Sequence, residues 1–134
     1  MLVDIDLNAV VEKPRLPADK TFTFQFIKAE LGTAKNPNKN TNVREPLIKC
    51  ELHPMEPEWS DRRVFHTFSL ALGALQSDDA CMSIKKFFTV VGHPWGQDGR
   101  FSVEDLLTIR FVGTVKYKEG QGFANLGSVL QGVS

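Results

Sequence analysis

The chain has 134 residues, enough for one domain with a single hydrophobic core and too few for two comfortable ones. Its apolar fraction of 42% and charged fraction of 24% are typical of a globular protein, and no apolar run approaches the ~18 residues of a membrane helix. The formal net charge is +0. That balance excludes a protein that holds nucleic acid by bulk charge, but it leaves local basic patches open.

The N-terminal sequence predicts a protein that is not exported. The opening MLVDIDLNAV has acidic residues where a signal peptide carries basic ones. Cys50 and Cys81 both lie in apolar patterns, which favours buried, reduced thiols. Because reduced thiols are typical of the cytoplasm, we predict that location, with no role at a membrane.

Residues 1–19 are predicted to form an extended N-terminal arm, followed by a single domain over residues 20–134. Pro14 and Pro17 forbid a helix in the arm. The stretch VDIDL near its start alternates apolar and acidic residues, so it could add an edge strand.

Three strands are predicted next, over residues 20–31, 43–52 and 62–70. In the first, phenylalanines alternate with polar residues until the pattern slips at Ile27, which indicates a β-bulge. The loop GTAKNPNKNTN between the first two strands is too long and polar for a tight hairpin. The turn HPMEPEWSD joins the second and third strands and is expected to expose Trp59.

The stretch SDDACMSIKKFFTVVG, residues 77–92, is predicted as the one long helix because its apolar residues fall at helical spacing. Ser77 is expected to cap the start of the helix and Gly92 to end it. A short helical turn is expected before it, at residues 71–75. The sequence SVED at 102–105 predicts a capping box that begins one further turn.

Two more strands are predicted over residues 107–117 and 123–130, joined by a hairpin loop that contains glycine. The order of three strands, a helix and two strands excludes a parallel α/β fold, in which strands and helices alternate. It predicts a mainly β fold, a five-stranded OB-like β-barrel with one main α-helix between strands 3 and 4. A different small β-barrel or a sandwich is the alternative.

The sequence carries no catalytic signature, so we predict that the protein is not an enzyme and needs no cofactor. It lacks a Gly-rich phosphate loop, a Cys-x-x-Cys pair and a nucleophile elbow. His53 and Glu56 lie among prolines, which makes regular metal ligation unfavourable, and no metal site is expected. Phe22, Phe24 and Phe26 are expected to line the core and not to stack on bases.

The candidate site follows from where an OB-fold binds its ligand. The ligand crosses strands 2 and 3 and is clasped by the loops that join strands 1–2 and 4–5, which are both basic here. Cations contact phosphates, and aromatic side chains stack on bases. The candidate nucleic-acid-binding residues are Lys35, Lys39, Arg44, Lys49, Arg63, Phe65, Lys116, Tyr117 and Lys118. An ordinary solvated surface is the alternative explanation of the same charges.

Four stretches of the chain carry a resemblance to a known group of proteins. They are DIDLNAVVEKPRLPADKTFTFQFIKAEL, LIKCELHPMEPEWSDRRVFHTFSLALGAL, KKFFTVVG and RFSVEDLLTIRFVGTVKYKEGQGFANLGSVL. In these the chain resembles bacteriophage single-stranded DNA-binding OB-fold proteins of replication and recombination modules. The resemblance implies an OB-fold, binding of single-stranded DNA in the host cytoplasm, and partners among phage replication or recombination proteins.

Together these observations predict a single-stranded DNA-binding protein of phage replication or recombination that binds largely independently of sequence. Oligomerisation with copies of itself is left open. The alternative is a non-catalytic protein-interaction module on the same barrel, a subunit of a phage replication or virion assembly. The zero net charge favours the alternative, and the two basic loops favour DNA.

Overall fold

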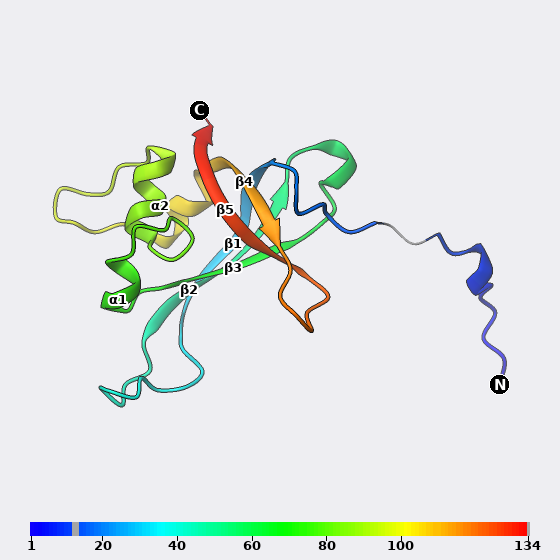
Figure 1. Cartoon of the computed structure of the whole chain (residues 1–134), viewed down its shortest axis with the longest axis horizontal. Helices are drawn as coiled ribbons and strands as arrows, with labels where there is room; N and C mark the ends of the chain where they lie inside the picture. The colour runs from blue at the N-terminus through cyan, green and yellow to red at the C-terminus, as the bar shows by residue number, and fades with distance from the viewer. Residues whose placement is uncertain (12–13, 134) are drawn as a thin grey trace.

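The structure is a computed structural model that describes residues 1–11 and 14–133 (Figure 1). It is mainly β, as predicted, with two short helices between the third and fourth strands. The strands are β1 (Phe22–Thr33), β2 (Pro46–Pro54), β3 (Val64–Ser69), β4 (Arg110–Lys116) and β5 (Ala124–Val133). The helices are α1 (Leu72–Leu75) and α2 (Ile84–Val91).

The five strands form one sheet that closes into a ring. They are hydrogen-bonded in the order β1-β2-β3-β5-β4, and β4 also pairs with β1. All neighbouring strands are antiparallel except β3 and β5, which run parallel and pair at Val64–Ala124 and Phe65–Asn125. The ring is therefore joined between β3 and β5 near the start of each strand.

The bulge predicted at Ile27 is confirmed. The pairing register of β1 with β2 shifts between Phe26 and Lys28. β1 pairs with β2 along one edge from Phe24 to Thr33, and with β4 along its other edge over Phe22–Gln25. Because a bulge bends a strand and increases its twist, it helps the sheet to curve and close into a ring.

The core fills the inside of the ring and is rich in phenylalanine. Phe22, Phe24 and Phe26 are all buried there, which confirms their predicted place. Phe87 of α2 lies at the centre of an aromatic cluster, with its ring centroid 5.2–5.8 Å from those of Phe26, Phe68 and Phe111. The apolar stripe of α2 therefore closes one end of the ring, where Figure 1 shows the helix beside the ends of the strands.

The predicted start of the main helix at Ser77 is wrong. The hydroxyl of Ser77 accepts the Asp79 N–H at 3.1 Å, and the Asp79 carboxylate accepts the Cys81 N–H at 2.9 Å. Such local bonds from a side chain to the backbone compete with a helix and hold residues 77–82 in turns. Residues 77–83, which were predicted to begin the helix, therefore lie outside it.

The helix begins instead after Ser83, which is its N-cap. The Ser83 hydroxyl accepts the Lys86 N–H at 3.1 Å and donates to the Leu75 carbonyl at 3.1 Å, so it also ties α2 to the end of α1. Gly92 ends the helix with a positive φ of 74°, as predicted. The helix has 8 residues and is much shorter than the predicted one.

Two further predictions about local structure are corrected. Trp59 is not exposed: it is half-buried in a short 3-10 helix, Pro57–Trp59, and its ring meets Phe22 edge-on at 6.3 Å. The capping box of Ser102 and Asp105 is confirmed, but it opens a 3-10 helix, Val103–Thr108, so β4 begins at Arg110 and not at residue 107.

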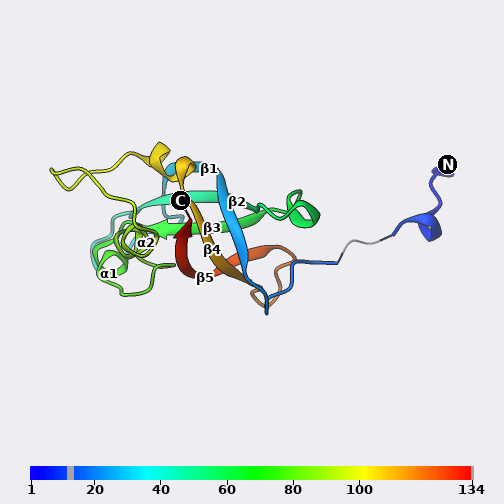
Figure 2. The same cartoon turned by 90° about the horizontal axis from the view of Figure 1, so that it is seen from above.

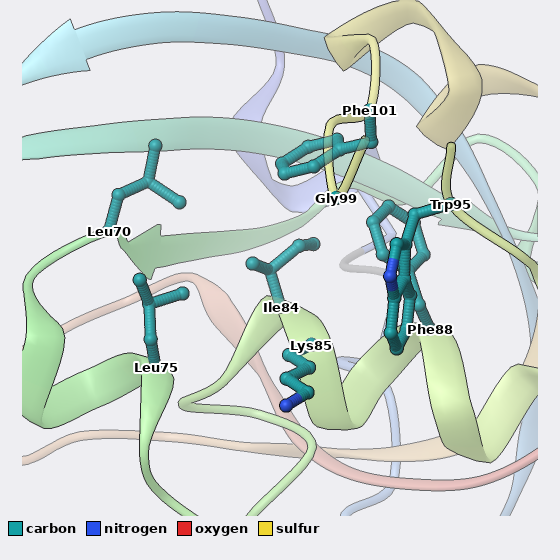
Figure 3. A pocket seen from close by; sticks show the side chains of 8 residues that line it. All are labelled: Leu70, Leu75, Ile84, Lys85, Phe88, Trp95, Gly99 and Phe101. Carbon is teal, nitrogen blue, oxygen red and sulfur yellow. The ribbon is translucent and has the colours of Figure 1, made fainter. Parts of the chain in front are cut away.

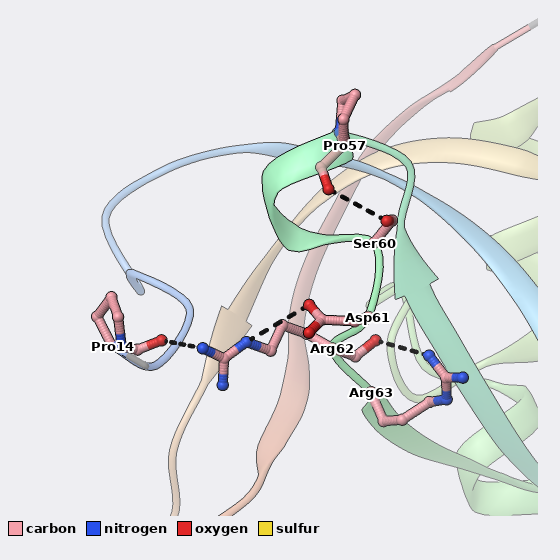
Figure 4. Close-up of polar contacts among 6 residues, drawn as sticks. All are labelled: Pro14, Pro57, Ser60, Asp61, Arg62 and Arg63. Carbon is pink, nitrogen blue, oxygen red and sulfur yellow. Dashed lines mark hydrogen bonds and ion pairs between the residues drawn. The ribbon is translucent and has the colours of Figure 1, made fainter. Parts of the chain in front are cut away.

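The N-terminal arm has two parts, and neither adds an edge strand. Residues 1–11 are exposed, contain a 3-10 turn at Leu7–Ala9, and lead away from the ring in both views (Figures 1 and 2). Residues 14–16 are anchored on the ring. Leu16 is buried, and the carbonyl of Pro14 accepts a hydrogen bond of 2.6 Å from the Arg62 guanidinium (Figure 4). The folded domain thus begins some residues before the predicted boundary at residue 20.

Gly132 of β5 marks a close approach between β5 and the end of α2. A Cβ atom at this position would overlap the Val91 carbonyl group. We expect Gly132→Ala to lower the free energy of unfolding by about 1–3 kcal/mol, as overpacking does elsewhere. Urea denaturation measures this, and Gly122→Ala is the control, since a Cβ there meets no atom within 4 Å. Equal stability of the two variants would contradict the close approach.

Candidate nucleic-acid interface

A groove of about 490 Å³ opens where β3 and β5 part after their short parallel pairing. Three segments line it: the outer side of β3, the hairpin between β4 and β5, and the turn at residues 79–82 that precedes α2. The hairpin is held by a hydrogen bond of 3.0 Å from the Gln121 N–H to the Lys118 carbonyl, and Gly120 takes a positive φ of 79° in it. The groove is thus built mainly by strand ends and a tight turn.

Two phenylalanine rings meet at one end of this groove. Phe65 and Phe123 contact each other edge to face, with centroids 5.3 Å apart and planes at 79°. Phe65 lies on the outer side of β3, as predicted, because its neighbour Val64 is buried inside the ring. Phe123 was not predicted as a site residue, and it is 45% exposed. The parallel pairing of β3 with β5 brings the two together, although they lie far apart in the sequence.

Basic side chains flank the phenylalanine pair on both sides. Lys116 and Lys118 line the groove, and both are exposed. A second hollow of about 250 Å³, lined by both rings, contains Arg15, Arg62 and Arg63. Each hollow also contains an acidic residue, Asp79 in the first and Asp61 in the second. The two hollows therefore bring together five of the predicted residues, namely Arg63, Phe65, Lys116, Tyr117 and Lys118.

His66, which is half-buried, and Cys81, which is buried, form the inner wall of the groove. Burial lowers the pKa of His66 from 6.5 to about 4, and Lys116 and Lys118 lower it further, while a hydrogen bond with the Cys81 backbone acts in the opposite direction. Burial raises the pKa of the Cys81 thiol to about 11 and that of the Cys50 thiol to about 12. Both cysteines are free and buried, and both are neutral thiols at physiological pH, which makes them poor nucleophiles.

The predicted cations of the first basic loop lie apart from the groove lining. Lys35, Lys39 and Arg44 are exposed in the loop between β1 and β2. The loop has some order of its own, because the Ala34 N–H donates to the Glu45 carbonyl at 2.8 Å. Nothing in the geometry of the described residues joins these cations to the phenylalanine pair.

Lys49 lies on an outer face of mixed charge. The register of β1, β2 and β3 places it between Glu30 and Thr67. Lys28, which forms an ion pair of 3.4 Å with Glu30, lies opposite Glu51. The sequence pattern predicted Lys49 and Glu51 on this face, but the neighbouring pair of Lys28 and Glu30 comes from pairing between strands and was missed.

Tyr117 has partners that a base-stacking residue would lack. Its hydroxyl donates to the Leu16 carbonyl at 2.7 Å, and the Arg15 guanidinium lies 4.1 Å from the centre of its ring. Burial raises the pKa of its hydroxyl group. In this arrangement Tyr117 fastens the arm to the closed sheet, and the Arg15 guanidinium covers one face of its aromatic ring.

Among the described residues, no group of three or more His, Cys, Asp and Glu side chains is placed to hold a metal ion. The carboxylate of Glu56, which precedes the Pro57 turn, accepts the Thr23 N–H at 2.7 Å and 3.2 Å.

No helix in the part of the chain that the structure describes is long and apolar enough to cross a membrane.

Comparison of the chain with protein-family models, with curated proteins and with solved structures finds no match. The resemblance to phage single-stranded DNA-binding proteins therefore stays a prediction from the sequence.

Proposed function

We propose that this protein binds single-stranded DNA, largely independently of sequence, in the groove between β3 and the β4–β5 hairpin. On this proposal the closed ring is an OB-type barrel, whose ligands lie across strands 2 and 3 and against the loop between strands 4 and 5. The strand order β1-β2-β3-β5-β4, with the helical region between β3 and β4, supports that interpretation. The protein would hold the strand without catalysis.

The observation that carries the proposal is the phenylalanine pair between two basic groups. Single-stranded nucleic acid needs cations along its phosphates and aromatic faces for its bases, and the pair Phe65 and Phe123 has lysines on one side and arginines on the other. A strand that passes from one hollow to the other would meet both cations and aromatic rings. The zero net charge of the chain predicts modest affinity, and contacts between its cations and the phosphates predict that binding weakens as salt is added.

The resemblance seen in the sequence supplies the biological setting of this proposal. It places the protein in phage replication or recombination, in the cytoplasm of the host cell, with other proteins of those modules as partners. A second candidate is a non-catalytic protein-interaction module. The mixed-charge face of Lys28, Glu30, Lys49 and Glu51 favours it, because alternating charges suit a protein surface better than a polyanion.

The test is a titration of labelled oligo-dT at two or more salt concentrations. We expect the double variant Lys116→Ala with Lys118→Ala to bind more weakly at low salt and to flatten the log–log salt dependence by roughly 0.7 for each phosphate left without its lysine. Phe65→Ala and Phe123→Ala should each cost about 1–3 kcal/mol of binding free energy with little change in that slope. The contrast separates binding to phosphates from stacking on bases.

The matched control is Lys35→Ala with Lys39→Ala, which removes the same charge from the other basic loop. If the groove is the binding site, this control should weaken binding less than the groove variant does. Wild-type protein that fails to bind oligo-dT at low salt would contradict the proposal and leave the interaction module as the better account. Melting temperatures of all variants show whether a loss of binding reflects a loss of fold.

A further inference from the structure

An apolar pocket of about 500 Å³ opens beside the two helices, on a part of the molecule separate from the groove. Its walls come from the end of β3, from α1 and α2, and from the loop at residues 95–101 (Figure 3). Large apolar side chains line it, namely Leu70, Leu75, Ile84, Phe88, Trp95 and Phe101. Lys85 is the charged residue in this lining. The volume lies within the ~300–1,000 Å³ of pockets that bind ligands.

The segment 1–11, MLVDIDLNAVV, presents an unusual density of exposed apolar side chains. Each of its large apolar residues is at least 58% exposed: Met1, Leu2, Val3, Ile5, Leu7, Val10 and Val11. The charged side chains of the segment, Asp4 and Asp6, are both acidic. A contiguous set of exposed apolar residues of this size marks a surface that binds a partner.

We propose that this segment of one copy of the chain docks into the apolar pocket of a second copy. On docking, the 3-10 turn at Leu7–Ala9 would open, and in the extended segment Val3, Ile5 and Leu7 would point to one side and the two aspartates to the other. The apolar side chains would enter the pocket, and Asp4 and Asp6 would stay at its rim, within reach of the exposed Lys85 side chain. The pocket and the segment thus match in both apolar character and charge.

The place of the segment in the single chain favours a second copy, because residues 1–11 do not lie in the pocket of their own chain. Pro14 is held by Arg62, just before β3, whereas the pocket begins at Leu70, just after β3. Beyond the anchor, residues 1–11 run away from the helices in both views (Figures 1 and 2).

Each copy has one pocket and one segment, so two copies that exchange their segments form a closed dimer with both pockets filled. A one-way contact leaves one pocket and one segment free, and further copies can then add in a row or close into a larger ring. The association requires no nucleic acid, and its test is therefore independent of the proposed function.

Sedimentation velocity of the full chain without nucleic acid, over a wide range of concentrations, tests the proposal. We expect species larger than the monomer to grow with concentration. Ile5→Asp with Leu7→Asp should raise the dissociation constant by about tenfold or more, because it buries charge in an apolar pocket. Val43→Asp is the control for the introduction of an aspartate, since Val43 is an apolar residue that is 57% exposed in a loop elsewhere.

A charge exchange provides a second test that does not depend on apolar packing. Lys85→Asp should weaken the association, and Asp4→Lys with Asp6→Lys should restore it in that background. Wild-type protein that stays monomeric at every concentration would overturn the proposal. The proposal would also be overturned if the protein is monomeric and its Trp95 fluorescence changes in the double variant Ile5→Asp with Leu7→Asp. In that case the segment occupies the pocket of its own chain.

Discussion

Phe87→Ala is expected to lower the free energy of unfolding by about 3–5 kcal/mol, as large aromatic residues removed from packed cores do. The Phe87 side chain is 0% exposed and touches the rings of Phe26, Phe68, Phe88 and Phe111. Its removal leaves a cavity where α2 meets the inside of the ring, and the lost contacts with the neighbouring aromatic rings are part of this cost. Urea denaturation followed by circular dichroism measures the change.

The control for this variant is Phe123→Ala, which removes the same side chain from a position that is 45% exposed. It should cost much less stability, because much of its surface is already in water. If Phe87→Ala unfolds at the same urea concentration as the wild type, then α2 does not close the ring. Phe87→Leu should fall between the wild type and Phe87→Ala, since leucine fills part of the cavity.

The sequence predicted the strands well because their patterns are local. Period-two alternation places Phe22, Phe24 and Phe26 inside, and a single slip at Ile27 reveals the bulge. Strand ends were less accurate: β2 begins at Pro46 and not at residue 43, because residues before it belong to the loop. The end of a strand depends on its partner, which local alternation does not contain.

The main helix shows where periodicity misleads. Cys81 lies on the same apolar stripe as Ile84 and Phe88, and it is buried as that stripe predicts. Its burial comes from a turn held by Ser77 and Asp79, side chains that stabilise turns as readily as helix starts. The sequence therefore predicted Ser77 as the N-cap, and the actual N-cap, Ser83, was missed.

The candidate site was predictable in its parts and not in its assembly. The alternation of inward and outward residues along β3 predicted that Phe65 points outward, and the place of Lys118 in the hairpin loop predicted it as a site residue. The partner ring of Phe123 and the anchoring role of Tyr117 depend on two long-range features, the β3–β5 pairing and the packing of the arm. The signal for Phe123 was an aromatic residue beside a Gly-bearing hairpin, which also fits an ordinary strand start.

His66 makes the stability of the fold depend on pH, and this is the second large expected effect. The pKa of His66 is about 4 in the folded protein, against 6.5 for the unfolded chain, chiefly because burial disfavours its charged form. The unfolded state therefore binds the proton first as the pH falls. The contribution of neutral His66 to the free energy of unfolding is fully present above pH 6.5. It declines below that pH and is lost as the pH falls through about 4.

We expect this histidine to account for about 3 kcal/mol of stability lost between neutral pH and pH 4, since each pKa unit is worth about 1.4 kcal/mol. Urea denaturation of wild type and His66→Gln at several pH values isolates the effect, because carboxylates that titrate in the same range are common to both. The variant should lose much less stability on acidification. His53→Gln, on the outer side of β2, is the matched control for removal of an imidazole. If the stability of His66→Gln and that of the wild type fall in parallel on acidification, then His66 binds a proton as readily in the folded protein as in the unfolded chain. The wall of the groove would then be open to solvent.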